Sequence, residues 1–411
     1  MTLPAGLPAY PALARALRAT TERLAQEVAA PSRVAPGWSD LEWKVARASA
    51  VMQGTTVLLS QRLRWRGPDA WQQFLVTQRQ QALERDARIA ALLQRIDVAL
   101  RAVRAGCIAL KGSALRRHAL YGAGERPMGD IDLLAPREES AQIGRALEAL
   151  DYECVSDVRR HRVYCPRAAL ANVHPGEHPD NPLKIEVHFR VAEPLPMRLV
   201  DITGTLIPEE GGCGLRDYAS VRALFRHLML HAAGNMRAHA LRQIQLHDIA
   251  LLAGRLSDED WVALLSSPDA QGGAWWMWPV LDLARRYYPD LVPAIVDEFH
   301  GCTPAWLRRT SMRKTLTDLS WSNLRIAAFP GIYWSRSPRE ALHFMRSRVL
   351  PDRVALEELG MSSRTQPAMV KTVSWYGVSH ARRIVRWMFS RPPRVQTLVS
   401  VQSALAAGER A

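Results

Sequence analysis

The feature that most constrains the fold is a change of hydrophobic period at Gly106. Before it, apolar residues recur at threes and fours over 69–105, which predicts a long helix. Directly after it, residues 107–110 form a short apolar run of the kind found in buried strands. Long stretches of helical spacing return after residue 217. Short apolar or alternating runs in between predict further strands at 131–135, 152–155, 161–165 and 183–191.

This order of elements predicts an α+β protein, in which helical domains flank a small mixed sheet. A chain of 411 residues is long enough for more than one core. Among the expected helices are 40–65, 114–121, 137–150 and 352–359. The expected regions are N-terminal helices at 1–105, an α/β core at 106–191, an irregular linker at 192–217, a helical domain at 218–361 and a basic, partly disordered tail at 362–411.

Composition points to an ordinary folded protein. Hydrophobic residues make up 48% of the chain and charged residues 23%, close to globular averages. No run approaches the ~20 apolar residues of a membrane span, and the N-terminus lacks the pattern of a secretory signal. The five cysteines are scattered without zinc-site spacing. We therefore expect a cytoplasmic protein.

The net charge of +14 is a weak argument for a nucleic-acid partner. Only five of the 54 basic residues are lysines, and an arginine- and alanine-rich composition is typical of GC-rich bacterial genomes. After residue 300 there are 18 basic and 6 acidic residues, so the excess lies near the C-terminus. Trp375, Tyr376 and Arg382 there can stack on bases and bind phosphates, but a solvated or membrane-surface segment has the same composition.

The sequence Asp130-Ile-Asp132 offers a possible metal site. Residues two apart on a strand point to the same face, so both carboxylates project together while Ile131 points into the core. A divalent cation commonly offsets the repulsion between such carboxylates, and magnesium prefers oxygen ligands. Taken alone, the pair is equally typical of exposed aspartates that cap a strand end.

Gly112-Ser113 follows the first expected strand and opens a helix. Free backbone N–H groups and the helix dipole favour an anion there, and Lys111 and the Ser113 hydroxyl add a cation and a donor. This arrangement can hold a triphosphate, although its spacing is not that of a P-loop. A strand-to-helix turn needs a glycine in any case, so the motif alone is compatible with a structural role.

Two further motifs carry charge near these. Glu186 stands between apolar residues on a late strand and faces either solvent or the two aspartates; Lys184 and His188 share its face. Arg126 precedes Asp130 by four residues, and its planar guanidinium can bind phosphate. Alternatively, Arg126 is an ordinary surface arginine, and His188 forms a structural hydrogen bond.

Taken together, the three motifs resemble the DNA polymerase β-like nucleotidyltransferase superfamily. Within it, the chain is similar to a bacterial family of uncharacterised nucleotidyltransferases. The segments that carry the resemblance are 110–115 (LKGSAL), 126–134 (RPMGDIDLL) and 185–188 (IEVH), with 228–231 and 246–249 in the helical part. One departure is the spacing between Ser113 and Asp130, where 16 residues intervene and the superfamily usually has fewer.

The resemblance implies an enzyme that moves a nucleoside monophosphate from an NTP, in the first instance ATP, to an acceptor hydroxyl. Two magnesium ions would be held by Asp130, Asp132 and Glu186, and the triphosphate by Gly112 and Ser113, with Lys111 and Arg126 as supporting residues. The acceptor is an unidentified small molecule, sugar, peptide or protein. Two alternatives stay open: a catalytically weak nucleotide-binding accessory protein, and a transferase directed at nucleic acid, which the position of the basic residues makes less favoured.

Overall fold

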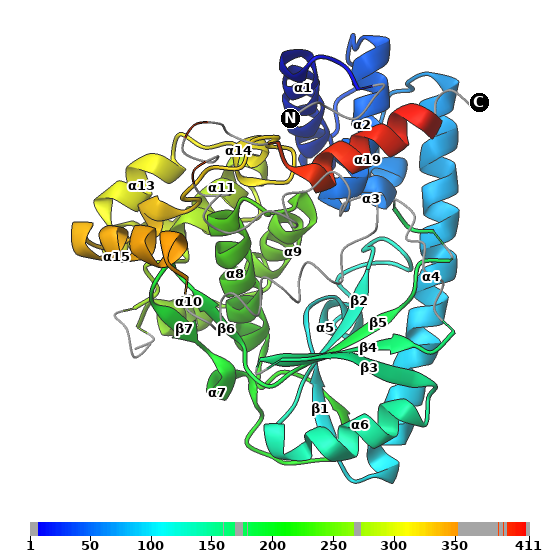
Figure 1. Cartoon of the computed structure of the whole chain (residues 1–411), viewed down its shortest axis with the longest axis vertical. Helices are drawn as coiled ribbons and strands as arrows, with labels where there is room; N and C mark the ends of the chain where they lie inside the picture. Colours follow the sequence, from blue (N-terminus) through cyan, green and yellow to red (C-terminus); the bar gives the residue numbers. More distant parts are fainter. Residues whose placement is uncertain are drawn as a thin grey trace.

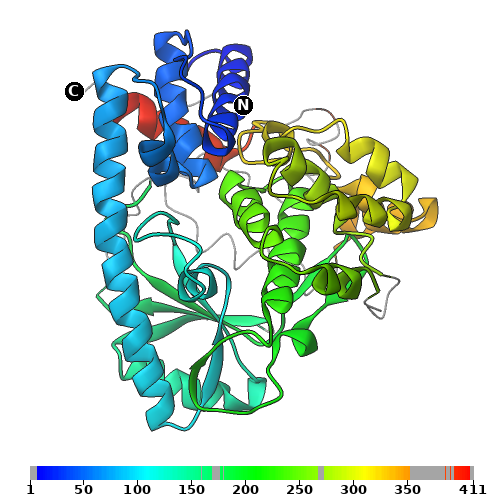
Figure 2. The same cartoon turned by 180° about the vertical axis from the view of Figure 1, so that it is seen from behind.

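A computed structural model describes residues 7–158, 160–168, 176–178, 180–266, 273–351, 385, 389 and 393–407. Its N-terminal part is helical, as expected, and forms the upper part of the molecule in Figure 1. The helices are α1 (Tyr10–Ala29), α2 (Asp40–Gln53), α3 (Thr56–Arg62) and α4 (Asp69–Ala102). The long helix α4 runs from this group down along the sheet, which Figures 1 and 2 show from opposite sides.

The single helix expected at 40–65 is wrong, because Gly54 divides it. Gly54 has φ 68° and ends α2 in the left-handed conformation that glycine adopts readily. At the other end of α2, Ser39 and Glu42 form a capping box that satisfies free backbone N–H groups. The apolar periodicity runs through both helices, which is why spacing alone does not reveal the break.

The centre of the molecule is a six-stranded mixed sheet, which confirms the α+β fold class. Its order is β3-β4-β5-β2-β1-β8. Strand β2 pairs parallel with β5 and antiparallel with β1, while β1 pairs parallel with β8. The strands are β1 (Gly106–Ala109), β2 (Asp130–Leu134), β3 (Tyr152–Asp157), β4 (His161–Pro166), β5 (Lys184–His188) and β8 (Gly214–Arg216).

One face of the sheet is covered by α4 and by α6 (Ser140–Glu148). The expected helix 137–150 is thus α6, preceded by the short 3-10 turn η1 (Arg137–Glu139). Side chains from both helices and the central strands form one apolar core. Burial of this surface is the main force that holds the helices on the sheet. Members include Ile96 from α4, Ile131 and Leu133 from β2, Ile143 from α6 and Ile185 from β5.

The segment 192–217, expected to be an irregular linker, contains regular structure. It includes β6 (Ala192–Pro194), β7 (Leu199–Asp201) and α7 (Thr203–Leu206), and it ends in β8, which joins the main sheet. Strands of three residues that contain proline or glycine carry too little periodic signal to be recognised in a sequence. They form because β6 and β7 pair with each other and β8 pairs with buried β1.

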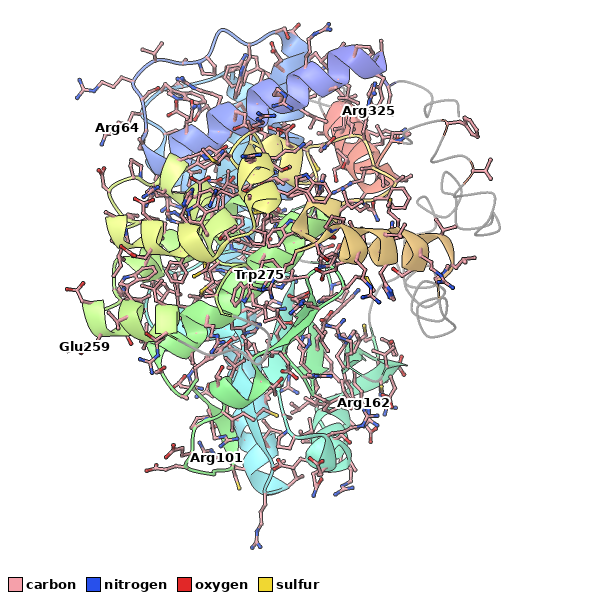
Figure 3. The ribbon with its side chains drawn as sticks, turned by 90° about the vertical axis from the view of Figure 1, so that its left-hand side faces the viewer. Arg64, Arg101, Arg162, Glu259, Trp275 and Arg325 are labelled. Atoms are coloured by element: carbon pink, nitrogen blue, oxygen red, sulfur yellow. The ribbon has the colours of Figure 1, made fainter. Side chains whose placement is uncertain are left out.

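The C-terminal half is helical, and α8 (Val221–Ala238) and α9 (Gln243–Ala253) lie nearest the sheet. Figure 3 shows Trp275 inside this part and Glu259 pointing outwards. The remaining described helices are α10 (Asp258–Ser266), α11 (Trp278–Tyr287), η2 (Ala294–Asp297), α12 (Glu298–Cys302), α13 (Ala305–Ser311), α14 (Leu316–Leu319), η3 (Ile332–Trp334), α15 (Pro338–Val349) and α19 (Val395–Ala407).

Part of the expected tail is a packed helix. Leu398 and Val401 of α19 are buried against Leu13 of α1 and Val45 of α2, so the two ends of the chain share one core. The expected helix 352–359 and the residues Trp375, Tyr376 and Arg382 lie outside the described residues. Within the described ranges, no helix has the length and apolar character that a bilayer span requires.

Candidate functional site

The site is built on the neighbouring strands β2 and β5. Their parallel register sets Asp130 opposite Lys184, Asp132 opposite Glu186 and Leu134 opposite His188. Because side chains alternate along a strand, Ile131 and Leu133 enter the core under α4 and α6 while the carboxylates take the other face. Charged residues predicted from separate motifs therefore come together on the face towards α8.

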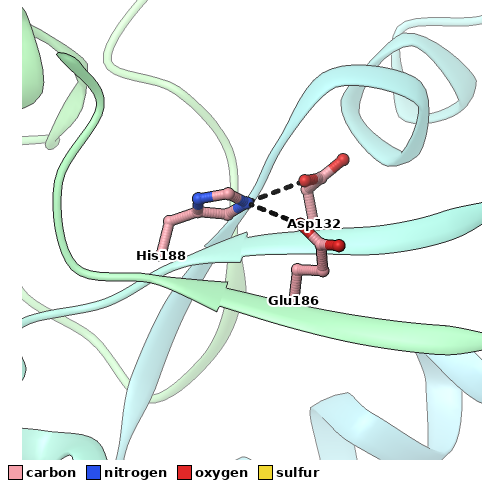
Figure 4. Close-up of side chains that lie close together, drawn as sticks. All are labelled: Asp132, Glu186 and His188. Atoms are coloured by element: carbon pink, nitrogen blue, oxygen red, sulfur yellow. Dashed lines mark hydrogen bonds and ion pairs between the residues drawn. The ribbon is translucent and has the colours of Figure 1, made fainter. Parts of the chain in front are cut away.

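Asp132 is the centre of the charged group. Its Oδ1 accepts one hydrogen bond from Lys111 Nζ and one from His188 Nε2, each at 2.8 Å. His188 Nε2 also lies 3.6 Å from Glu186 Oε2, as Figure 4 shows. Burial would raise the pKa of Asp132, but Lys111 and His188 outweigh it and hold that pKa well below its usual value. Asp132 is thus a permanently charged carboxylate.

Lys111 reaches Asp132 from an unusual backbone position. Its φ is 47°, a left-handed conformation that costs a non-glycine residue on the order of 1 kcal/mol. Its backbone N–H donates to Tyr218 Oη at 3.2 Å. Burial opposes the charged form of Lys111, yet attraction to Asp132 and Asp130 outweighs burial and raises the lysine pKa. Lys111 begins helix α5 (Lys111–Arg117), which therefore starts three residues earlier than the expected start at 114.

Asp130 has a different environment from Asp132. Repulsion from Asp132, together with burial and repulsion from Glu186, raises the pKa of Asp130. A raised pKa means that this end of the site has more negative charge than nearby cations balance. The close group of possible ligands consists of Asp132, Glu186 and His188, and Asp130 lies outside it. Asp130 lines the same cavity as Asp132 and Glu186.

The donor set is suited to a divalent metal. One ligand atom each from Asp132, Glu186 and His188 lies within 4.8 Å of the other two, which is close enough to surround one ion. Carboxylate oxygens suit magnesium and manganese, whereas an imidazole nitrogen suits zinc and other transition metals. The uncompensated charge at Asp130 also favours a cation. These residues therefore fit a metal ion, and Lys111 is the cation that now contacts Asp132.

A cavity of about 360 Å³ opens over the carboxylates. Gly112, Arg126 and Arg242 are among its lining residues, with Asp130, Asp132 and Glu186. A Cβ added to Gly112 would lie 2.5 Å from Arg126 Nη1 and 2.8 Å from Met128 Sδ. A larger residue would displace the Arg126 or Met128 side chain from the wall, so the predicted Gly112 has a steric reason to be there.

The structure places Ser113 and Arg126, the next two residues predicted to bind phosphate, in different environments. Ser113 is 1% exposed, and its Oγ has no hydrogen-bond partner among the residues that the structure describes. Arg126 forms a forked ion pair with Asp248, with Nε–Oδ1 2.8 Å and Nη2–Oδ2 2.7 Å. Tyr121 Oη donates to the same Asp248 Oδ1 at 2.6 Å. Asp248 thus fixes one edge of Arg126, while Nη1 is turned towards Gly112.

Sequence reasoning missed Arg85, a buried arginine of α4 that supports the site. Its guanidinium donates to the carbonyls of Met128 at 2.9 Å, Gly129 at 3.0 Å and Asn181 at 2.8 Å. These carbonyls belong to the loops that lead into β2 and β5, so Arg85 ties together the segments before Asp130 and Lys184. Its place on the apolar stripe of α4, between Ala82 and Ile89, was the available signal.

Arg242 belongs to none of the three sequence motifs, but its position is distinctive. It precedes α9, and its Nε donates to the Met52 carbonyl at 3.0 Å. A Cβ on Gly54 would lie 2.7 Å from Arg242 Nη2, so the glycine that ends α2 also leaves room for this guanidinium. Within the described part of the chain, no carboxylate forms an ion pair with Arg242. Burial, followed by repulsion from Arg126, lowers its pKa.

A larger cavity of about 510 Å³ lies on the other side of the carboxylates. Lys111, Glu186 and His231 line both cavities, so the two meet at these residues. Burial lowers the pKa of His231 to about 3, which makes it a neutral imidazole at ordinary pH; Asn235 Nδ2 lies 3.1 Å from its Nε2. His227 is hydrogen-bonded to Tyr218 at 2.6 Å.

Comparison with known proteins agrees with this geometry. A family model described as uncharacterised nucleotidyltransferase matches residues 39–289, which is more than half of the chain and includes both cavities' central residues. Neither curated proteins nor solved structures give a match.

Proposed function

Because the chain belongs to the family of uncharacterised nucleotidyltransferases, we propose that it transfers a nucleoside monophosphate from an NTP, ATP in the first instance, to an acceptor hydroxyl. The family match supports transferase activity in general. The donor, the acceptor and the metal requirement are our proposal. The observation that carries it is the β2–β5 register, which aligns Asp132 with Glu186 beside Asp130 at a cavity rimmed by Gly112 and Arg242.

The charge of the smaller cavity supports a polyphosphate ligand. Arg242 has no ion-pair partner among the described residues, and Arg126 keeps one edge towards Gly112 although Asp248 neutralises it. Arg126 lies close enough to lower the pKa of Arg242, and two neighbouring arginines favour an anion between them. Carboxylates across the same cavity would repel that anion unless a cation is shared, which is the usual function of magnesium at a phosphate site.

In this proposal Asp130, Asp132 and Glu186 hold two magnesium ions, with His188 as a further ligand or as a positioning residue for Asp132. Bound magnesium supplies charge neutralisation and lowers the pKa of a nearby hydroxyl. The reaction forms a bond between the acceptor oxygen and the α-phosphorus and breaks the bond between that phosphorus and the bridging oxygen of pyrophosphate. The hydroxyl loses its proton, and pyrophosphate leaves.

The protein's own groups have separate tasks. Arg242 and the Gly112 backbone bind and orient the β- and γ-phosphates, and Arg126 adds its free edge. Lys111 is the cation nearest the reacting end and stabilises negative charge there as the bond to pyrophosphate breaks. Ser113 remains a predicted contributor through its hydroxyl. His188 keeps the Asp132 carboxylate oriented through its 2.8 Å hydrogen bond.

One observation favours an alternative, a nucleotide-binding protein with little catalysis. Lys111 and His188 already neutralise Asp132 Oδ1 by two hydrogen bonds, as a metal ion would. If that arrangement persists with nucleotide bound, the protein would bind ATP without needing magnesium and would turn it over slowly. The same measurement separates the two functions.

The test is calorimetry with ATP in the presence and absence of magnesium, followed by labelled-ATP turnover with a lysate of the native host. The proposed function predicts magnesium-dependent binding that is lost when Asp130→Asn and Asp132→Asn are combined, and label that appears in an acceptor. Binding that ignores magnesium and the double substitution supports the accessory protein. No ATP binding under either condition would contradict both.

A further inference from the structure

We propose that the larger cavity is the acceptor site and that Glu193 in its wall selects neutral polyhydroxyl compounds by binding adjacent hydroxyl groups. This inference rests on the proposed function, since it supplies the acceptor of that reaction. It assigns a role to a carboxylate that no motif in the sequence identifies and that the metal site does not use.

Glu193 is a carboxylate with open hydrogen-bonding capacity. It lies on β6 and lines the larger cavity together with His227 and His231 of α8. Among the described residues, no hydrogen bond or ion pair joins its carboxylate to another group. A carboxylate accepts up to about four hydrogen bonds, so a largely buried one without protein partners is ready to accept from a ligand.

The position of the Glu193 carboxylate is set by a glycine. A Cβ added to Gly234 on α8 would lie 2.7 Å from both Cδ and Oε2 of Glu193. The carboxylate thus packs against Gly234, which has no side chain and leaves space for it. Burial raises the pKa of Glu193, while Arg160 and Arg237 favour its charged form.

The surrounding charges argue against an ammonium ligand. Arg160, Arg237 and Lys111 are all close enough to act on Glu193, and each would repel an added cation. An anionic group placed against the Glu193 carboxylate would be repelled by that carboxylate. Hydroxyl groups donate to a carboxylate without adding charge, and two adjacent hydroxyls match its two oxygens.

Apolar residues of the wall suit the carbon face of such a compound. Val155, Val163 and Leu230 line the cavity, and its 510 Å³ is within the range of small-molecule sites. A ring with an apolar face and a rim of hydroxyls buries the former against these residues and presents the latter to Glu193. Because the cavity shares Glu186 and Lys111 with the smaller one, another hydroxyl of the same compound can reach the α-phosphorus.

The experiment uses the full chain, magnesium and α-labelled ATP with the small molecules of a host-cell extract, separated by ion exchange into cationic, neutral and anionic fractions. We expect label in the neutral fraction. Treating that fraction with periodate, which cleaves adjacent diols, and removing the excess before ATP is added should abolish the transfer. Label that appears only with the cationic, the anionic or the macromolecular fraction overturns the assignment.

Two variants test Glu193 itself. Glu193→Gln removes the charge, and Gly234→Ala displaces the carboxylate while adding a good helix former to α8. At limiting acceptor both should lower transfer about tenfold, the lower end for a charge-assisted hydrogen bond. Glu209→Gln, the same change at an exposed loop position, is the matched control and should leave transfer unchanged.

Calorimetry of the same variants separates this inference from the proposed function. Magnesium–ATP affinity should be native-like in both, because Glu193 lines only the other cavity. If the native protein does not bind ATP, the proposed function fails. If the whole lysate accepts label but the neutral fraction does not, or if Glu193→Gln transfers as well as Glu209→Gln, the acceptor assignment alone is overturned.

Discussion

The two faces of the six-stranded sheet differ in composition: one is apolar and packed, and the other is charged and lines the cavities. The face under α4 and α6 is closed by apolar side chains such as Ile131 and Ile185, which are 0% exposed. The opposite face, from the same two strands, carries Asp132 and Glu186 towards α8 and two cavities. Because side chains alternate along a strand, buried apolar residues and charged residues are next to each other in the sequences of β2 and β5.

The comparison shows how the charged face is tolerated. Like charges close together on one face of a sheet are destabilising, and repulsion from Asp132, two residues further along the same strand, raises the pKa of Asp130. Apolar burial on the other face holds the strands in register against it. The stability of the fold and the reactivity of the site should therefore respond to different substitutions, and four predictions test that separation.

The largest effect is expected for Asp132→Asn. Removing the charge that faces Lys111, His188 and a bound metal should lower nucleotidyl transfer by about 10³-fold, since charge placed at the reacting centre is usually the largest catalytic contribution. Single-turnover transfer of label measures it, and thermal unfolding should change by only a few degrees. A variant that keeps more than a tenth of the native rate would show that Asp132 is not at the reacting centre.

In the apolar core on the other face of the sheet, Ile96→Ala should lower the stability of the fold and not the rate of transfer. Ile96 of α4 is 0% exposed in the apolar core, so the cavity left behind should lower the free energy of unfolding by about 2–5 kcal/mol. Urea denaturation gives this value. Transfer per folded molecule should stay close to native. If Ile96→Ala instead lowers the rate of fully folded protein as much as Asp132→Asn does, the two faces are not separable.

The third prediction concerns Arg242, which joins the charged face to the N-terminal helices through Met52. Arg242→Gln should weaken magnesium–ATP binding by about 10- to 100-fold, the range for a lost charged hydrogen bond to phosphate. Calorimetry measures it. Arg255→Gln, at an exposed arginine just beyond the other end of α9, is the control for lost positive charge. Equal affinities of the two variants would remove Arg242 from the phosphate site.

The sequence predicted the charged face better than its surroundings. Alternation places Asp130 with Asp132, and the late position of Glu186 between apolar residues marks a strand, so the shared face follows from period alone. The order of the strands and the parallel β2–β5 register do not follow from the period. Pairing depends on tertiary contacts between segments some 50 residues apart. The structure brings Glu186 next to Asp132 through that register.

Other residues of the site could not be recognised from the sequence, for physical reasons. Arg85 and Arg242 are two of many arginines. Burial distinguishes Arg85, and a place in the cavity wall distinguishes Arg242, and neither leaves a pattern in the sequence. Glu193 stands on a three-residue strand that has no detectable period. Asp248 reads as a polar residue inside an apolar helix, and its partner Arg126 is 122 positions away. Long-range polar pairs of this kind leave no local pattern in one sequence.

The last prediction concerns acid stability, at His247 of α9. Burial lowers its pKa to about 3, whereas an unfolded histidine titrates near 6.5, so between these values the unfolded chain binds a proton that the folded chain does not. Stability should be fully present above about pH 6.5 and fall towards pH 3 by at most ~1.4 kcal/mol per pH unit from this residue. His247→Phe keeps the ring contacts with Tyr121 and Tyr288 and should flatten the dependence by that amount in urea titrations across this range. His343→Phe at an exposed position of α15 is the matched control, and equal slopes for the two variants would show that buried His247 stays uncoupled from folding.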